Sequence, residues 1–442
     1  MSVSPARRDE IIDALRRGTV PSQGLDALAI GIERFQPAFD EDLDRIAAGG
    51  GVFKAIRGEY GAGKTFLTRW LAERAKARGL VTAEVQISEA DTPPHRYQTI
   101  YRRLVEQLST STVRSGALRA VVDSWFFTLE DDVLSAGEVT ESDSEELTQR
   151  TAALMEQRLS GITRTAPAFS AVLRAYLTAT SAGDRATADG LLAWLGGQPH
   201  VAASVKRSAG IKGDLDHDAA LAFLAGLCVV LRDAGFGGLL LVLDEAETMQ
   251  RMRSDSRDKA LEALRKLIAD VYEGRFPGFG LVITGTPAFF DGTQGVQRLP
   301  PLAQRLATDF GPEPRFDNPR AVQIRLRGFT LESLVAVGQR VRDLYVDGSA
   351  VAPRIEEHVD DAYLADLASA VTGNLGHKVG IAPRLYIKKL VDVLDRVDLN
   401  ADFDPRRDYQ LTVSDRELTP VERNTRAGAQ SPDEIDLDVE RP

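Results

Sequence analysis

The sequence predicts an α/β fold: a parallel β-sheet flanked by helices, a helical insertion, and a C-terminal helical lid with a winged or β extension. Three observations support this fold class. The apolar stretch 52–56 is followed by a glycine-rich loop, 58–63, and then by a stretch of helical spacing. The apolar stretches 239–243 and 281–283 each end in polar residues, and continuous apolar runs are typical of strands in buried parallel sheets. The region 110–218 lacks strand alternation and repeats apolar residues at helical intervals.

The composition is that of a soluble globular protein. Its hydrophobic fraction of 43% is enough for one large core or two moderate ones. No run of about 18 apolar residues is present that could span a membrane. The first residues, MSVSPARRDEIIDALRR, lack the apolar centre of a secretion signal, so we expect a cytoplasmic protein. The net charge of −11 argues against a protein that coats nucleic acid by itself. The only cysteine, Cys228, lies in an apolar run and is expected to be inert.

The glycine-rich loop matches the pattern G-x-x-x-x-G-K-[ST] of a phosphate-binding (Walker A) loop. Its glycines let backbone N–H groups converge on phosphate oxygens, and the following helix N-terminus adds partial positive charge. We expect Lys64 to reach the β- and γ-phosphates of ATP and the Thr65 hydroxyl to hold Mg²⁺. A glycine-rich turn without function would not require the preceding strand and the following helix. The residues predicted to contact ATP here are Gly58, Glu59, Tyr60, Gly61, Ala62, Gly63, Lys64, Thr65 and Phe66.

A second set of candidate residues follows the two later strands. Asp244 and Glu245 end the apolar run 239–243, in the manner of a Walker B motif. Ligands bind at this end of the strands in open α/β sheets, so we expect Asp244 to hold Mg²⁺ and Glu245 to polarise the attacking water. Thr284, at the end of the next strand, is predicted to orient that water, in preference to Thr286. The alternative for these threonines is a strand-end turn without function.

These motifs in this order resemble the AAA+ ATPases. The resemblance implies that the acidic strand lies beside the strand of the phosphate loop. It implies that the segment ALAIGIERF, with Ile30 and Gly31, lies against the adenine, and that Arg384 of the lid points at the γ-phosphate. It also implies that an arginine before the fifth strand, Arg305 or Arg315, reaches a neighbouring subunit's ATP, and hence that ATP promotes a homo-oligomeric ring or arc.

A closer resemblance is to the BrxD-type ATP-binding proteins of bacterial BREX phage-defence systems. It rests on three segments, IRGEYGAGKTFLTRWLAERA, VQISEADTPPHRYQTIYRRLVEQL and IAPRLYIKKLVDVL, and runs from about Arg8 to Arg423. In that family the protein is encoded beside a large DNA helicase of the Lhr type. The resemblance therefore implies action in phage defence with such a helicase, and contact with DNA directly or through it.

The sequence also predicts how the chain is divided. The proposed parts are 1–50, a helical and adenine-contacting segment; 51–330, the ATPase core, with the helical insertion at about 110–218; 331–426, the lid; and 427–442, an acidic disordered tail. We interpret the insertion as a docking platform rather than padding of the core. The stretch DYQLTVSDREL, 408–418, is predicted to form a closing strand of the lid.

Two functions remain open, and a third fits less well. The first is a hydrolytic ATPase that oligomerises and works on DNA with its helicase partner. The second is a nucleotide-gated scaffold in which ATP orders the lid and turnover is slow or incidental. Glu245 favours the first, because hydrolysis needs a base at that place. A small-molecule kinase would share the phosphate loop but would not explain the Asp-Glu pair and the lid.

Overall fold

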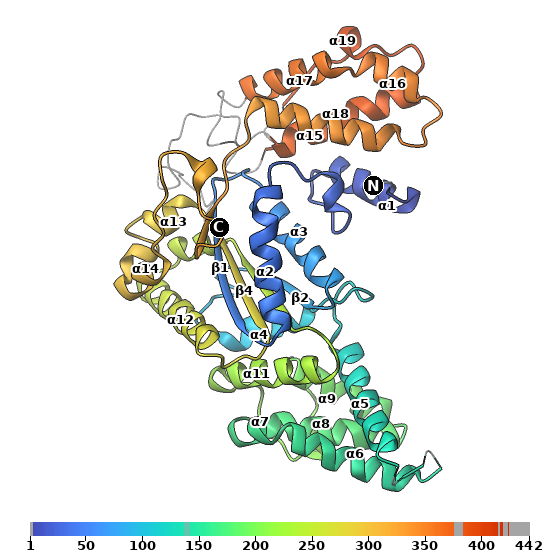
Figure 1. The fold of residues 1–442 in the computed structure, drawn as a ribbon, viewed down its shortest axis with the longest axis vertical. Helices are drawn as coiled ribbons and strands as arrows, with labels where there is room; N and C mark the ends of the chain where they lie inside the picture. Colours follow the sequence, from blue (N-terminus) through green and yellow to red (C-terminus); the bar gives the residue numbers. More distant parts are fainter. Residues whose placement is uncertain are drawn as a thin grey trace, which may run out of the picture.

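A computed structural model describes residues 3–137, 139–140, 142–374, 383–413, 416–418 and 423. A β-sheet with flanking helices lies in the middle of the molecule, the helical insertion extends from one end, and the helical lid covers the other (Figure 1). The predicted acidic tail, 427–442, lies outside the described residues.

In the described part of the chain the central sheet has five parallel strands, in the order β2-β3-β4-β1-β5. Their bounds are Gly51–Arg57 (β1), Val81–Gln86 (β2), Leu239–Asp244 (β3), Phe279–Gly285 (β4) and Gln323–Arg325 (β5). The expectation that the acidic strand lies beside the phosphate-loop strand is wrong, because β4 lies between β1 and β3 and pairs with both. All seven residues of β4 are buried, which suits the central place in the sheet.

Alternate residues of each strand face opposite layers of helices. In β3, Leu240 and Val242 pack in the apolar cluster formed with α2 (Gln36–Ala47) and α3 (Lys64–Ala77). Leu239, Leu241 and Leu243 belong to the cluster on the other face. There the sheet is covered by α4 (Tyr97–Glu106), α11 (His217–Asp233) and α12 (Ser254–Tyr272). The short helices α13 (Pro287–Asp291) and α14 (Pro300–Leu306), which connect β4 to β5 along the chain, also belong to this cluster. Burial on both faces explains why these strands read as continuous apolar runs.

The insertion is helical, as its residue spacing predicts. Its helices are α5 (Leu118–Ser135), α6 (Ser144–Arg158), α7 (Ser160–Thr165), α8 (Pro167–Ser181), α9 (Arg185–Leu195) and α10 (Ala203–Ser208). Trp125 and Phe169 are fully buried in the same apolar cluster as Phe223 of α11 and the buried Cys228. The insertion therefore shares a continuous core with one face of the sheet. No helix in the described part of the chain is long and apolar enough to cross a membrane.

The lid combines the C-terminal helices with the first helix of the chain. It consists of α15 (Leu331–Val346), α16 (Ala352–His358), α17 (Asp361–Asn374), α18 (Pro383–Leu399) and α19 (Pro405–Asp408), against which α1 (Pro5–Arg16) packs (Figure 1). Ile11 and Leu15 of α1 share the apolar cluster of the lid. The guanidinium of Arg16 donates to both carboxylate oxygens of Asp395 at 2.7 and 2.8 Å, and Tyr345 donates to the same carboxylate.

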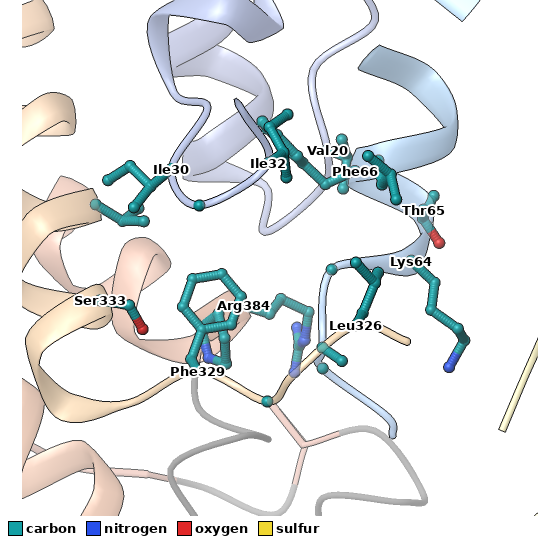
Figure 2. A pocket seen from close by; sticks show the side chains of 18 of the residues that line it. Val20, Ile30, Ile32, Lys64, Thr65, Phe66, Leu326, Phe329, Ser333 and Arg384 are labelled. Atoms are coloured by element: carbon teal, nitrogen blue, oxygen red, sulfur yellow. The ribbon is translucent and has the colours of Figure 1, made fainter. Parts of the chain in front are cut away.

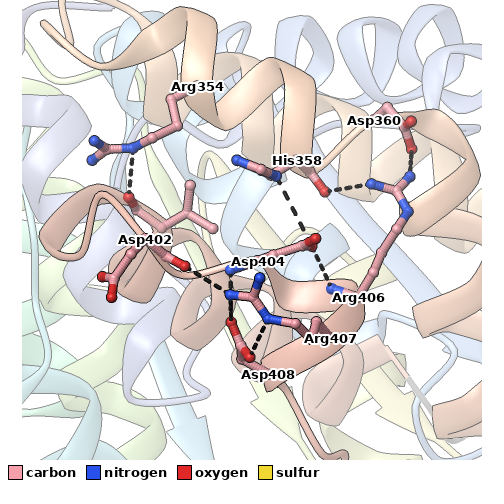
Figure 3. Close-up of polar contacts among 9 residues, drawn as sticks. Arg354, His358, Asp360, Asp402, Asp404, Arg406, Arg407 and Asp408 are labelled. Carbon is pink, nitrogen blue, oxygen red and sulfur yellow. Dashed lines mark hydrogen bonds and ion pairs between the residues drawn. The ribbon is translucent and has the colours of Figure 1, made fainter.

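Beyond α18 the lid is held by polar contacts rather than by a strand. Arg354 donates to the Asp398 carbonyl at 2.7 Å. Arg406 donates to the His358 carbonyl and to the Asp360 carboxylate (Figure 3). The predicted closing strand at 408–418 is wrong for the described residues 408–413 and 416–418, which contain no strand. Leu411 and Val413 pack against the lid cluster instead, so their alternating pattern reflects helix contact.

Candidate nucleotide-binding site

The candidate site is a cavity of about 640 Å³ where the carboxyl ends of the strands meet the N-terminal segment and the lid. Figure 2 shows Lys64 and Thr65 at one end, Ile30 and Ser333 at the other, and the apolar side chains of Val20, Ile32, Phe66 and Phe329 between them. The cavity is thus polar at the phosphate loop and mostly apolar elsewhere. This division suits a ligand with an aromatic base and a charged phosphate chain.

The phosphate loop has the backbone geometry that its glycines predict. Gly61 and Gly63 have φ of 80° and 89°, in the left-handed region, and Gly63 is the residue before α3. At Gly58 a Cβ would lie 3.1 Å from Ala62 and 3.2 Å from Leu326, closer than ordinary contact. The loop is therefore a tight cradle that side chains at these positions would distort, with the N-terminus of α3 directed into it.

Lys64, the first residue of α3, turns back onto the loop. Its Nζ donates to the carbonyl oxygens of Gly58 at 2.8 Å and Glu59 at 3.3 Å. It lies 3.8 Å from a carboxylate oxygen of Glu247 and 5.1 Å from the centre of the Tyr60 ring. The predicted phosphate-binding cation is thus a buried lysine at the polar end of the cavity.

Asp244 is the centre of the second predicted group. One of its carboxylate oxygens accepts from the Thr65 hydroxyl at 3.1 Å, and the other accepts from the Thr284 hydroxyl and from the Glu245 N–H. The Thr284 hydroxyl also accepts from the Glu245 N–H at 3.1 Å. The structure therefore brings together all four of these predicted residues. Thr284 is fully buried and does not line the cavity, whereas Thr286 caps α13 by accepting from the Phe289 N–H.

Glu245 lines the cavity in an unusual backbone conformation. Its φ of 60° lies in the left-handed region, which costs a non-glycine residue about 1–3 kcal/mol. Its carboxylate accepts from Gln86 Nε2 at 2.8 Å. Gln86 ends β2, next to β3 in the sheet, and sequence reasoning missed it. Its position at the carboxyl end of a strand could have marked it as a candidate site residue. Its contact with Glu245, however, depends on β2 lying beside β3, which the sequence does not show.

Glu247 is a second residue that sequence reasoning missed. It lies in a short 3₁₀ helix, Ala246–Arg251, directly after the predicted acidic pair, and it lines the cavity while only 5% exposed. Burial raises the pKa of its carboxyl, and the nearby Lys64 opposes that rise. The sequence DEAE contained a signal, an acidic residue two positions after Glu245, but its burial was not apparent.

The apolar part of the cavity includes both residues predicted to lie against the adenine. Ile30 and Gly31 line it together with Phe329 and with Ile387 of the lid. Gly31 has a φ of 72°, and a Cβ at this position would meet no heavy atom within 4 Å, so its backbone faces open space. Phe66, from the first turn of α3, completes this wall.

Helix α3 holds the N-terminal segment in place over the cavity. The Glu73 carboxylate accepts from the Gly24 and Leu25 N–H groups at 2.7 and 3.0 Å. The indole N–H of Trp70 donates to Asp26 at 2.6 Å. The helix that begins at the phosphate loop therefore also positions the wall on which a base would rest.

The three predicted arginines lie in different places. Arg384, in the first turn of α18, lines the cavity, and its guanidinium donates to the Glu417 carbonyl at 2.6 Å. Arg315 also lines the cavity and pairs with Glu313 at 2.6 Å. Arg305 is exposed on α14, away from the cavity lining of its own chain.

The oxygen atoms near the phosphate loop suit Mg²⁺. Thr65 Oγ1 and Asp244 Oδ2 lie 3.1 Å apart at the cavity edge. Mg²⁺ characteristically binds through one or two protein oxygens together with substrate phosphates and water, rather than in a protein cage. No group of three or more His, Cys, Asp or Glu side chains that could hold a metal by themselves occurs among the described residues.

Comparisons with known proteins identify the family. A comparison with curated proteins gave no match. Among solved structures, the chain is similar to one described as "Structure of Drosophila ORC bound to DNA", at 12% identity and a TM-score of 0.29, with 88% of this chain and 67% of that chain covered. That likeness is too weak to support any statement about this chain. The family model described as "BREX system ATP-binding protein BrxC/D" matches residues 3–413. The chain therefore belongs to the BrxC/D family of BREX system ATP-binding proteins.

Proposed function

We propose that this BREX ATP-binding protein hydrolyses ATP with Mg²⁺, and that it does so as a homo-oligomer working on DNA with a helicase of the Lhr type. The observation that supports hydrolysis best is the hydrogen-bonded group of Thr65, Asp244, Thr284 and Glu245 at the edge of the cavity. Simple nucleotide storage requires the phosphate loop but no carboxylate fixed beside it. The net charge of −11 favours a protein that helps a helicase over one that tracks DNA alone.

The residues have distinct roles in the proposed reaction. The backbone N–H groups of the loop and Lys64 bind the phosphates and stabilise the negative charge that develops on them during the reaction. Glu245 accepts a proton from the attacking water while the water oxygen bonds to the γ-phosphorus. The bond between the γ-phosphorus and the β,γ-bridging oxygen breaks, and ADP and phosphate are released. Bound Mg²⁺ would neutralise phosphate charge, and Thr65 and Asp244 are placed to hold it.

The neighbouring residues position the base. Thr284 fixes Asp244 and the Glu245 backbone, and Gln86 fixes the Glu245 carboxylate. Because both act on Glu245 or Asp244 and not on substrate, we assign them positioning roles. Arg384 of the lid is proposed to contact the γ-phosphate when the lid closes.

The decisive experiment substitutes Glu245→Gln in the full chain. The variant keeps the side-chain shape and its contact with Gln86 but removes the base, so we expect ATP affinity near wild type and turnover at least about 100-fold lower. Binding is measured by titration with labelled ATP, and turnover by phosphate release with DNA and the helicase present. Lys64→Ala is the paired variant and should lose ATP binding.

The two variants separate the competing functions. Wild-type turnover in Glu245→Gln would show that Glu245 is not the base. A wild-type protein that binds ATP but releases no phosphate, even with DNA and the helicase, would favour the nucleotide-gated scaffold. Wild-type ATP affinity in Lys64→Ala would contradict the assignment of the phosphate loop.

A further inference from the structure

Glu247 is a buried carboxylate without a hydrogen-bond donor. Both its oxygens are inaccessible to solvent and neither has a hydrogen-bond partner. A buried carboxylate in a structural role is normally held by two or more donors, because leaving it unpaired is costly. Glu247 lines the polar end of the cavity, beside the phosphate loop.

The cation that faces Glu247 is Lys64. The two side chains are 9% and 6% exposed, and their charged atoms are 3.8 Å apart, an ion-pair distance without a hydrogen bond. Lys64 makes its hydrogen bonds to the Gly58 and Glu59 carbonyls instead. Glu247 therefore contributes negative charge where the phosphates of a nucleotide would lie, with Lys64 as its counter-ion.

We infer that Glu247 is an internal competitor of the nucleotide phosphates for Lys64, so that it lowers the affinity for ATP more than that for ADP. The inference rests on the proposed phosphate-binding role of Lys64. Phosphates that take over Lys64 leave Glu247 unpaired beside new negative charge. The cost grows with the number of phosphate charges, because like charges in a poorly solvated site repel strongly.

Glu247 thus has a regulatory role rather than a catalytic one. Nucleotide can be released after hydrolysis only if its phosphates do not bind too tightly. The buried negative charge of Glu247 keeps the affinity for the phosphates low enough for release. Bound phosphates repel the Glu247 carboxylate. Because Glu247 lies in the 3₁₀ helix Ala246–Arg251, the position of this helix should depend on whether the phosphates are bound.

The test measures binding of ATP, ADP and adenosine to Glu247→Gln and to wild type in EDTA, by calorimetric titration of the full chain. Glutamine keeps the size and removes the charge, and Lys64 keeps both its carbonyl acceptors. We expect ATP affinity to rise about tenfold, ADP affinity to rise about threefold, and adenosine affinity to stay unchanged. A role in packing alone would alter all three ligands alike.

Three further variants complete the test. Glu247→Asp disturbs the packing but keeps the charge, so it should not tighten ATP binding. Glu273→Gln removes one exposed charge at the end of α12 and controls for net charge. If Glu247→Gln does not fold, Glu247→Met gives the same comparison with an apolar side chain of similar length.

The outcomes are distinguishable from failure of the proposed function. If wild type binds ATP and Glu247→Gln binds it equally or more weakly, the competitor role is wrong. An equal gain for ATP and adenosine contradicts it as well. If wild type binds no ATP under conditions in which the chain is folded, the phosphate-binding assignment itself is overturned.

Discussion

At the scale of single residues, the hydroxyl of Thr284 connects the two acidic residues of the site. It donates to the Asp244 carboxylate and accepts from the Glu245 N–H, while its own side chain is fully buried. A hydroxyl is well suited to this place because it donates one hydrogen bond and accepts another. Its position on β4, between the strands of the loop and of the acidic pair, makes the connection possible.

Replacement of Thr284 by valine tests this connection. Valine has nearly the same shape but neither donates nor accepts, so Asp244 and Glu245 lose a common anchor. We expect kcat to fall about tenfold or more with ATP affinity little changed, since misplacing a catalytic group costs rate rather than binding. The measurement is steady-state phosphate release beside an ATP titration.

Thr286→Val provides the matched control for Thr284→Val. It removes the cap of α13, two residues further along the chain. It should lower stability by about 1 kcal/mol without a comparable loss of turnover. Equal losses of turnover in both variants would contradict the positioning role of Thr284.

The sequence predicted the residues of the phosphate loop and the acidic pair because each is local, with the motif and its strand or helix adjacent in the chain. Gln86 and Glu247 could not be predicted in the same way. The contact of Gln86 with Glu245 requires that β2 lie beside β3, and the burial of Glu247 requires the packing of the 3₁₀ helix against the cavity. Neither follows from residue spacing.

At the scale of elements, a buried ion pair helps to hold the segment that leads into the edge strand β5. Lys54 of β1 donates to the carbonyls of Arg320 and Ala321, each at 2.9 Å, and lies 3.4 Å from the Asp42 carboxylate of α2. Burial lowers the pKa of Lys54 and raises that of Asp42, and each charge partly offsets the effect on the other. The short strand β5 is thus held by a side chain as well as by its own backbone.

Lys54→Met should destabilise the protein by about 3 kcal/mol, because it leaves the Asp42 carboxylate buried without its partner. The free energy of unfolding is measured by urea denaturation. The double variant with Asp42→Leu should recover much of the loss, since removing both charges leaves neither unpaired. No recovery in the double variant would show that the carbonyl contacts, rather than the ion pair, carry the stability.

The lid provides a prediction for pH. The Asp360 carboxylate accepts from Arg406 (Figure 3). It also accepts from the Tyr363 N–H, and this backbone hydrogen bond is the main cause that lowers the pKa of Asp360. A lowered carboxyl pKa stabilises the folded state above the unfolded value of about 3.9, and this stabilisation is lost as the pH falls through the folded value. Asp360→Asn keeps an acceptor but removes the charge.

We therefore expect Asp360→Asn to melt at a lower temperature than wild type at pH 7, by a small margin because the pair is partly exposed. The difference should shrink below about pH 4. Differential scanning calorimetry across this range is the measurement. A difference that stays constant down to about pH 3 would show that the charge of Asp360 is not its source.

Elements with strong periodicity were predicted well, and one weak element was not. Apolar runs predict the strands β1, β3 and β4, and the glycine that precedes its first turn predicts the start of α3. These signals are local in the sequence and do not depend on contacts with distant residues. The alternation in 408–418 resembled a strand, but a strand also needs an edge to pair with. The described part of the lid offers only helices, against which Tyr409 and Leu411 pack.

At the scale of the whole molecule, the positions of two arginines bear on assembly. Arg315 lines the cavity of its own chain, whereas Arg305 is exposed on α14 outside it. Both side chains are exposed, as an arginine supplied to a neighbouring subunit has to be, but only Arg305 lies outside the cavity of its own chain. This arrangement favours Arg305 as the residue proposed to reach a neighbour's ATP.

We expect ATP to promote a closed ring, of six subunits more readily than of any other number, or a smaller arc. Arg305→Ala should abolish turnover and leave ATP binding nearly intact, since an arginine supplied in trans can contribute about 1000-fold or more to the rate. Mass photometry with and without ATP measures the assembly, and phosphate release measures the turnover.

Mixing Arg305→Ala with Lys64→Ala subunits supplies the control, because each variant lacks a different half of a shared site and the mixture should regain part of the activity. Full turnover by a protein that stays monomeric with ATP, DNA and the helicase would contradict the shared site. If Arg315→Ala alone loses turnover, the arginine of the shared site has been misassigned.

The first helix of the chain belongs to the lid, whereas the segment that follows it is fastened to α3 on the core. The backbone therefore passes between lid and core at two places, near Gly18 and near Gly328, and both line the cavity. A rigid part attached at two points keeps one easy rotation, about the line that joins them. The nucleotide would lie beside this axis, where small displacements of the base or the phosphates turn into large movements at the far end of the lid.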